Sequence, residues 1–373
     1  MAEILVFKTD SFDTDALVED VLAYSADSIV LVLGFDGRIK VVHMPGGEGK
    51  QVVGLFRFKG ERLNNLFSPL IFLFDLAVYA RLFTAICIRH RPRLCWIENT
   101  FAAAIAGALR KFGLCGSIVY LPGDWLMPEK RGAGIKKSLW GMLFIAADYA
   151  ACRSASLVLN STHRITEARL RFWGRAIARK EELYHFNMKV KALEVKKGAR
   201  RKICFLGNVR EDSGLEIIMG ALKKIREKQD VALKFIGPSG GYERIRRMAG
   251  DFRIEEHVEL LGFVERDRLP QAVSDCFCGV NLLTSPDSYS SYTIPGKLVH
   301  YLQFLLPVIT TPGAGVMAGV ISDNRLGLVI EPRGEEFVGA ALKLHLMQDE
   351  FRENISGYIA GLPRVEFQEL IEA

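Results

Sequence analysis

The segment Tyr289–Ile309, YSSYTIPGKLVHYLQFLLPVI, reads as a polar loop, a helix that opens at Pro295 and a buried strand. Proline suits the first turn of a helix because its φ is already restricted and it has no N–H group to leave unpaired. The other N–H groups of that turn lack partners within the helix, and together with the helix dipole they favour an anion. Lys297 adds a full positive charge in the same turn. The segment therefore predicts a diphosphate-binding site; the alternative is an ordinary helix start beside a solvated lysine.

The rest of the chain alternates between short apolar runs and helical patterns. In the second half, the predicted strands are KICFLGN (202–208), ALKFI (232–236), VELLGFV (258–264), CFCGVNLL (276–283), LPVITTP (306–312) and LGLVIEP (326–332). In the first half, they lie at 4–7, 28–34, 39–44, 93–99, 117–122 and 156–162. Strands that alternate with helices of about 10–15 residues favour parallel, doubly wound sheets. The expected fold class is α/β, with two doubly wound, Rossmann-like parallel-sheet domains facing a cleft.

Loops rich in glycine follow several strands of the second half. LGN, IGPSGG, LGFV, LLTSP and TTPGAG all fall where a predicted strand ends. In open α/β sheets, ligands bind beyond the carboxyl ends of the strands, and glycine lets the backbone approach a ligand closely. Since the predicted anion site lies in the same half, this half is the expected ligand-binding domain.

Length and composition indicate a two-domain globular protein. A chain of 373 residues is too long for one ordinary domain, and its 49% hydrophobic content supplies an ample core. The N-terminal EILVF runs directly into polar KTDSFDTD, so we expect no secretory leader. The seven cysteines form no C-x-x-C pair, and most lie in apolar runs, as reduced core residues of a cytoplasmic protein do.

Positive charge is concentrated in one part of the chain. Between Ala151 and Lys202, 14 Lys and Arg stand against four Glu, although the net charge of the chain is only +6. Such a block favours an anionic membrane surface or substrate; without an RNA-binding or helix-turn-helix pattern, nucleic acid is not expected as a partner. The alternative is a solvated helix with a basic linker. The apolar segments Leu66–Ile88 and Lys136–Ala151 are either helices against the inner face of a membrane or helices of the core layer.

Residues 202–332 resemble the C-terminal, donor-binding domain of GT-B glycosyltransferases of the large retaining family 4 group. CFLGNVREDSGLEIIMGAL, LKFIGPSGG, VELLGFVERDRLPQAVSDCFCGVNLLTS, PGKLVHYLQFLLPVIT and GLVIEP follow one another in the order and spacing of that family. In the first half, RPRLCWIEN and IVYLPGDWLMPE are similar to a strand and a loop of the family, and VEFQELIEA to its tail helix. The resemblance implies an acceptor-binding domain at 1–185, a nucleotide-sugar donor domain at 186–345 and a helical tail at 346–373 that crosses back to the first domain.

Several family positions carry other residues here. The family loop G-R-L-x-x-x-K-G holds the donor diphosphate with Arg and Lys, whereas Asn208 and Ser213 occupy those positions; Arg210 would supply the missing cation. The paired glutamates of the family fall on Tyr292 and His300. In the first domain, the usual histidine is Gly123, while the aspartate after it is kept as Asp124.

The resemblance and the residue patterns together predict the site. Lys297 and Arg210 would stabilise the departing diphosphate, and Asp124 would orient the sugar or the acceptor. The remaining donor-binding residues are predicted to be Gly207, Asn208, Gly237, Tyr292, Thr293, Pro295, Gly296 and His300. No metal and no cofactor are expected; the D-x-D sequence at 13–15 precedes a helix and is interpreted as a cap.

The function implied is that of a glycosyltransferase of hexosyltransferase type, metal-independent and retaining. It would move a sugar from a nucleotide-sugar donor to a glycan or lipid-linked acceptor. The expected location is the cytoplasm, with an anionic membrane surface at the inner face as a further partner. The alternative is a catalytically degenerate GT-B protein that binds sugar nucleotides or acts as a scaffold. The sugar, the base and the acceptor are not identified by the sequence.

Overall fold

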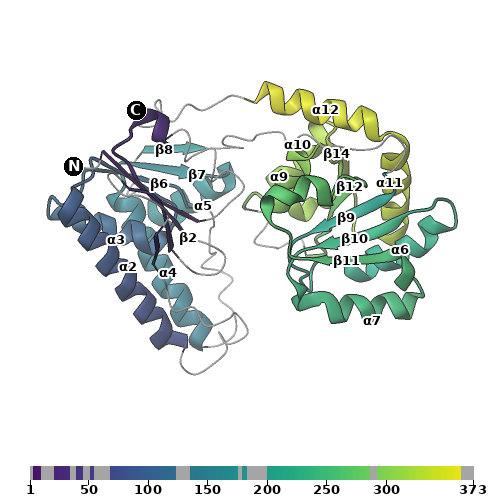
Figure 1. Cartoon of the computed structure of the whole chain (residues 1–373), viewed down its shortest axis with the longest axis horizontal. Coiled ribbons are helices and arrows are strands. Elements are labelled where there is room, and N and C mark those ends of the chain that lie inside the picture. The colour runs from purple at the N-terminus through teal and green to yellow at the C-terminus, as the bar shows by residue number, and fades with distance from the viewer. Residues whose placement is uncertain are drawn as a thin grey trace. The chain divides into compact units, whose positions relative to one another are not determined.

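The computed structural model describes residues 3–9, 21–33, 39–44, 51–53, 68–122, 135–174, 179–182, 200–285 and 292–362. The chain divides into two compact units. One contains Met1–Asn187 together with Arg364–Ala373, and the other contains Met188–Pro363. Each unit has its own sheet and its own buried core (Figure 1).

The first unit is built on an eight-stranded sheet. Its strands are β1 (Ile4–Thr9), β2 (Ile29–Leu33), β3 (Ile39–His43), β4 (Gln51–Val53), β5 (Leu94–Ile97), β6 (Ser117–Tyr120), β7 (Leu157–Asn160) and β8 (Arg179–Glu182). Their order across the sheet is β4-β3-β2-β1-β5-β6-β7-β8. The six strands from β2 to β8 in this order pair in parallel, as the sequence predicts for a doubly wound sheet.

Two strands at one end of this sheet depart from the predicted parallel pairing. β3 pairs antiparallel with β2, and β4 pairs antiparallel with β3. Only residues 34–38 connect β2 to β3, whereas a connection between parallel neighbours needs about a dozen residues or more. The antiparallel pairing follows from this short connection.

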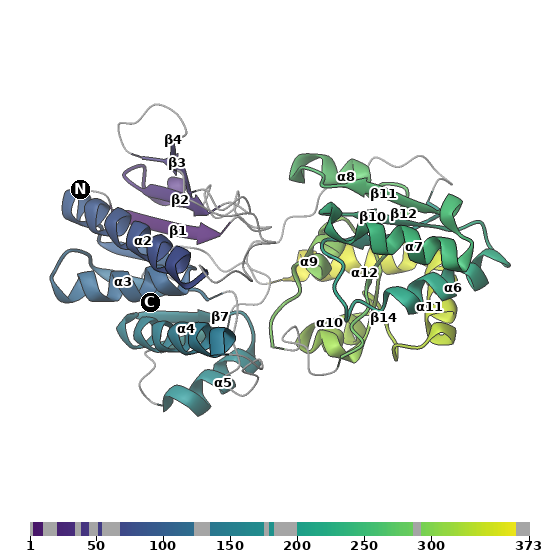
Figure 2. The ribbon, with the colours of Figure 1, turned by 90° about the horizontal axis from the view of Figure 1, so that it is seen from below.

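Three helices cover one face of the first sheet. α2 (Ser68–His90), α3 (Thr100–Lys111) and α4 (Ile135–Ser154) lie side by side (Figure 2). Phe83 and Cys87 of α2 and Ala151 of α4 are buried in the core beneath them. The later parts of the two apolar segments singled out in the sequence, whose side chains the structure describes, therefore contribute to the core layer. In the part of the chain that the structure describes, no helix has the length and apolarity of a membrane span.

A buried ion pair joins α4 to α5 (His163–Trp173). Arg169 donates hydrogen bonds to both carboxylate oxygens of Asp148, at 3.2 and 2.9 Å, and both side chains are excluded from solvent. The Tyr120 hydroxyl and the Trp173 indole N–H donate to the same carboxylate at 2.9 and 3.1 Å. Arg169 also donates to the amide oxygen of Asn160 at 2.6 Å. Because the charges are paired and hydrogen-bonded, their burial is tolerated.

The second unit contains a six-stranded sheet in which every pairing is parallel. Its strands are β9 (Lys202–Leu206), β10 (Ala232–Ile236), β11 (Val258–Gly262), β12 (Cys276–Asn281), β13 (Val308–Thr310) and β14 (Gly327–Val329). Each lies within a predicted strand. The order is β11-β10-β9-β12-β13-β14, so the direction of winding reverses between β9 and β12. Such a switch point is where open α/β sheets bind ligands.

Helices pack on both faces of the second sheet. They are α6 (Leu215–Arg226), α7 (Tyr242–Phe252), α8 (Leu269–Ala272), α9 (Gly296–Gln303), α10 (Val316–Asp323), α11 (Gly334–Leu346) and α12 (Gln348–Gly361). α6, α7 and α11 contribute to one core, and α9 and α10 to the other. α12, within the segment expected as a tail, buries Phe351 and Ile355 in the cores of this unit; residues 363–373 lie outside the described residues.

All seven cysteines are buried with free thiols, as predicted for reduced core residues.

The buried ion pair makes a prediction for stability. We expect Arg169→Ala to lower the free energy of unfolding by about 3–5 kcal/mol, because Asp148 would remain buried without its cation. All four tryptophans of the chain lie in the first unit, so their fluorescence during urea unfolding reports on that unit alone. Arg171→Ala, on the exposed side of the same helix, is the matched control and should change stability by less than about 0.5 kcal/mol. Equal effects of the two variants would contradict the assigned role of the pair.

Candidate functional site

Three glycines stand where neighbouring strands of the second sheet end. Gly207 follows β9, Gly237 follows β10 and Gly262 ends β11. The N–H of Gly237 donates to the carbonyl of Gly262 at 2.9 Å. A side chain at Gly237 would place its Cβ 2.6 Å from the carbonyl oxygen of Gly207, so only glycine fits there. At Gly207 and Gly237, which were predicted as donor-binding residues, and at Gly262, which was not, the backbone itself forms the edge of the sheet, as close approach to a ligand requires.

Tyr301 holds α9 against the two strands at the switch point. Its hydroxyl accepts a hydrogen bond from the N–H of Leu206, at the end of β9, at 2.8 Å. It donates to one of the carbonyl oxygens of Cys204 and Val280, each 3.1 Å away. The ring packs directly on Gly279 of β12, where an added Cβ would lie 2.4 Å from ring carbons. One buried side chain therefore fixes the position of α9 on β9 and β12.

Lys297, one turn before Tyr301, points toward the sheet. Its Nζ lies 4.3 Å from the ring centroid of Phe205, a buried residue of β9. α9 begins at Gly296 with Pro295 as its N-cap, so the proline stands one position before the first helical turn in which the sequence placed it. Pro295 gives no side-chain hydrogen bond to that turn. The start of α9 therefore combines N–H groups that the Pro295 side chain does not cap with an inward-facing ammonium.

The loop between β9 and α6 is closed by Ser213. Its buried hydroxyl accepts the N–H of Arg210 at 2.9 Å, and its own N–H donates to the carbonyl of Arg210 at 3.2 Å. Thr284, just after β12, donates its N–H to the carbonyl of Asp212 at 2.9 Å and so ties the loop to the switch point. Ser213, at the position of the family lysine, thus serves the turn rather than a ligand.

Arg210 forms an ion pair with Asp212 in this loop. The guanidinium Nη2 lies 2.8 Å from Oδ2 of Asp212, and the two side chains are 48% and 19% exposed. The other carboxylate oxygen, Oδ1, is buried and has no hydrogen-bond partner among the described residues. Both charges act on Lys297. The structure thus brings the two predicted cations into one electrostatic cluster, together with a carboxylate that the sequence analysis did not single out.

The protonation of Lys297 is set by this environment. Burial, with a contribution from the positive charge of Arg210, lowers the pKa of Lys297 to about 8, although Asp212 acts in the opposite direction. Within the part of the chain that the structure describes, no carboxylate lies within ion-pair distance of the ammonium. An anion bound nearby would favour the charged form, because an opposite charge raises the pKa of an amine. The cluster is therefore suited to bind an anionic group.

The other predicted site residues are distributed around the start of α9. Thr293 is buried, Tyr292 is partly buried and Gly296 is exposed. His300 stacks on Phe304, with ring centroids 6.0 Å apart and planes 12° apart. Asn208 is exposed directly after Gly207. Asp124 and the D-x-D sequence at 13–15 lie outside the described residues.

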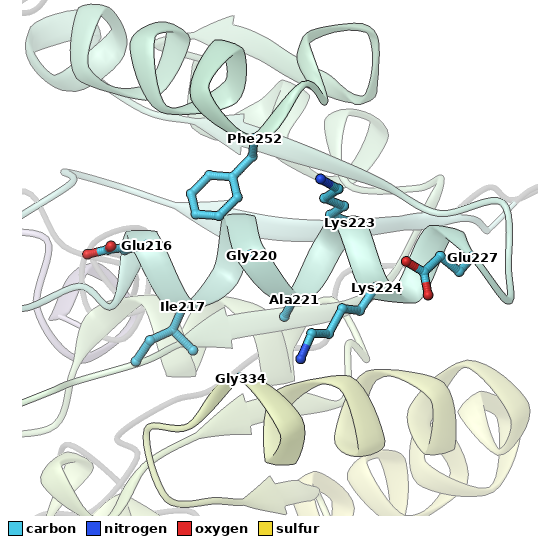
Figure 3. A pocket seen from close by; sticks show the side chains of 9 residues that line it. All are labelled: Glu216, Ile217, Gly220, Ala221, Lys223, Lys224, Glu227, Phe252 and Gly334. Carbon is cyan, nitrogen blue, oxygen red and sulfur yellow. The ribbon is translucent and has the colours of Figure 1, made fainter.

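A separate hollow lies on the outer side of α6. It has a volume of about 510 Å³ and is bordered by α6, by Phe252 at the end of α7 and by Gly334 at the start of α11 (Figure 3). Its charged rim consists of Glu216, Lys223, Lys224 and Glu227. The residues that line it are different from the predicted donor-site residues.

Comparisons with known proteins agree with this geometry. Residues 200–346 match the family model described as glycosyl transferases group 1. A sucrose-phosphate synthase from Thermosynechococcus elongatus has a similar structure, with a TM-score of 0.69, 14% identity, and coverage of 95% of this chain and 94% of that one. An α,α-trehalose-phosphate synthase (UDP-forming) from Burkholderia vietnamiensis has a TM-score of 0.67 and 13% identity, with coverage of 96% of this chain and 93% of that one. HepE from Anabaena, in complex with UDP and glucose, has a TM-score of 0.57 and 14% identity, with coverage of 97% of this chain and 100% of that one. No curated protein matches the sequence.

The protein has the α/β fold of GT-B glycosyltransferases, with one parallel-dominated sheet in each unit. More narrowly, its residues 200–346 are similar to the family described as glycosyl transferases group 1.

The contacts of Tyr301 can be tested directly. We expect Tyr301→Phe to destabilise the second unit by about 1–3 kcal/mol, because the buried N–H of Leu206 would lose its acceptor. Native-state hydrogen exchange measures this at the amide of Leu206. Exchange at unchanged rate in the variant would show that the hydroxyl does not hold α9 to β9.

Proposed function

We propose that the protein transfers a hexosyl group from a nucleotide sugar to a glycan or lipid-linked acceptor. The observation that carries the proposal is the inward-facing Lys297 beside Arg210, at the switch point of a glycosyl transferases group 1 domain. The complex of HepE from Anabaena with UDP and glucose supports a nucleotide-sugar donor for this fold.

The chemistry of sugar transfer requires these charges. The bond between the anomeric carbon and the diphosphate breaks, so negative charge grows on the departing diphosphate. In the proposal, Lys297, Arg210 and the first N–H groups of α9 stabilise this charge. Gly207 and Gly237 let the backbone approach the donor.

The finer features of the reaction are also part of the proposal. We infer a metal-independent, retaining transfer, in which the departing phosphate accepts the proton of the acceptor hydroxyl and no separate protein base is required. The two cations take the role that a divalent metal plays in other transferases. Asp124 orients the sugar or the acceptor, and the reaction takes place in the cytoplasm.

A second function is favoured by two observations in the β9–α6 loop. The hydroxyl of Ser213 is hydrogen-bonded within a buried turn, and the guanidinium of Arg210 forms an ion pair with Asp212. In such a site, Lys297 is the one predicted cation without an ion pair among the described residues. This suits a sugar-nucleotide-binding or scaffolding protein that does not catalyse sugar transfer.

Lys297→Ala tests the donor site. UDP or GDP sugars should raise the melting temperature of the wild-type protein, and the variant should bind them at least about tenfold more weakly, because a charged hydrogen bond contributes about 1.5–3 kcal/mol. Lys223→Ala, which removes a lysine from the outer hollow, is the matched control and should keep the shift. A melting temperature that no nucleotide sugar changes would refute the donor site. Binding without release of nucleoside diphosphate, whatever acceptor is offered, would instead support the second function.

The lowered pKa of Lys297 predicts how donor binding depends on pH. Its ammonium is charged below pH 8 and loses its proton above it, so affinity for a nucleotide sugar should fall by up to about tenfold per pH unit as the pH rises past 8. Isothermal titration between pH 7 and 9.5 measures this, since the diphosphate diester of the donor does not titrate there. Lys297→Arg should bind with a flat profile. A wild-type profile that is equally flat would contradict the assignment.

A further inference from the structure

Three neighbouring helices of the first unit end in basic residues. The last turn of α2 contains Arg89 and His90, that of α3 contains Arg110 and Lys111, and that of α4 contains Arg153. Each helix leads into a strand of the parallel part of the sheet, β5, β6 or β7. Their carboxyl ends therefore lie at the edge of the sheet where these strands begin.

Hydrogen bonds hold these helix ends together. The guanidinium of Arg110 donates to the carbonyl of Ser154, the last residue of α4, at 2.9 Å. The N–H of Gly116, after α3, donates to the carbonyl of Pro92, after α2, at 2.9 Å. The residues at 88–93, 110–116 and 153–154 therefore form one continuous surface, which we call the basic end.

Two large apolar side chains are exposed on the basic end. Phe112 is 79% exposed and Ile88 is 58% exposed. Phe112 caps α3 and is followed by Gly113, whose φ of 69° turns the chain back toward the sheet, so the phenyl ring stands at the tip of the turn. In water, exposure of both side chains is unfavourable.

The charged side chains exposed around them are cations. Arg89, Arg91, Arg93 and Lys111 are exposed, and none pairs with a carboxylate among the described residues. Cations at a helix end complement its dipole, which accounts for Arg89 and Lys111. The dipole does not account for Arg91 and Arg93, which lie beyond the end of α2, or for the exposed apolar residues.

We propose that the basic end docks on an anionic lipid bilayer. Phe112 and Ile88 enter the headgroup region, and the surrounding arginines and lysines face the lipid phosphates. A bilayer fits better than nucleic acid, because an exposed isoleucine gains from burial in lipid but has no ring on which a base could stack. The carboxyl ends of the parallel strands point the opposite way, so docking leaves that edge uncovered. The proposal does not depend on sugar transfer.

Co-sedimentation of the full chain with vesicles tests the proposal. The protein should bind phosphatidylcholine vesicles that contain phosphatidylglycerol, should not bind pure phosphatidylcholine, and should dissociate as ionic strength rises above about 0.1 M. Phe112→Ser should weaken binding by about tenfold or more. The matched control is Phe263→Ser, since Phe263 is 65% exposed near the end of β11 in the second unit.

Charge reversal provides a second, independent variant. Arg89→Glu combined with Lys111→Glu should abolish binding to the anionic vesicles, whereas Lys223→Glu combined with Lys224→Glu, with the same change of net charge on the second unit, should leave it intact. Equal losses in the two pairs, equal losses in the two phenylalanine variants, or binding of RNA but not of anionic vesicles would overturn the proposal. Unchanged melting temperatures exclude misfolding as the cause of any loss.

Discussion

The hydroxyl of Tyr301 is the contact on which the proposed donor site of the second unit depends. It accepts a hydrogen bond from the N–H of Leu206 in β9, and the ring of the same side chain lies directly on Gly279 of β12, so α9 is held at one distance from the switch point. Residues four apart lie on the same face of a helix, which places Lys297 on the face that Tyr301 turns toward the sheet. The contact of the ammonium with Phe205 follows from this geometry. A structural tyrosine thereby sets the position of the charge that the proposed chemistry uses.

The surroundings of two cations, Arg169 in the first unit and Lys297 in the second, differ in an informative way. Burial alone would lower the pKa of Arg169, but the carboxylate of Asp148 raises it above its ordinary value. For Lys297, burial dominates and the pKa falls. A cation with a protein carboxylate serves the fold, since its charge is already neutralised. A cation that is buried without such a carboxylate is stabilised when an anion arrives from outside, and this difference separates a core ion pair from a binding residue.

The sequence predicted the strands of the second unit because each is an apolar run that stops at glycine or another turn residue. It also located Lys297, Arg210, Gly207 and Gly237 in one region, because parallel strands end at a common edge. It predicted the strand β3 but not its antiparallel pairing, and it missed β4 and the charged strand β8, because these pairings are decided by tertiary contacts. Nor did it find the pair of Asp148 and Arg169, since residues 21 apart on two helices carry no pattern that links them. The sequence also did not reveal the role of Tyr301, because in the helical pattern it occupies one of the apolar positions of α9.

The β9–α6 loop balances its charges in a way that suits the proposed donor site. An ion pair as exposed as that of Arg210 with Asp212 is worth at most about 1 kcal/mol, whereas a charged hydrogen bond to a phosphate is worth about 1.5–3 kcal/mol, so a diphosphate can recruit the guanidinium. Asp212 then stands beside the bound anion with one oxygen already unpartnered. Its influence on Lys297 matters little at neutral pH, because a group with a pKa of about 8 is largely protonated there. Repulsion is therefore its larger effect, and in the proposed reaction it would weaken the binding of a diphosphate that leaves once the sugar has been transferred.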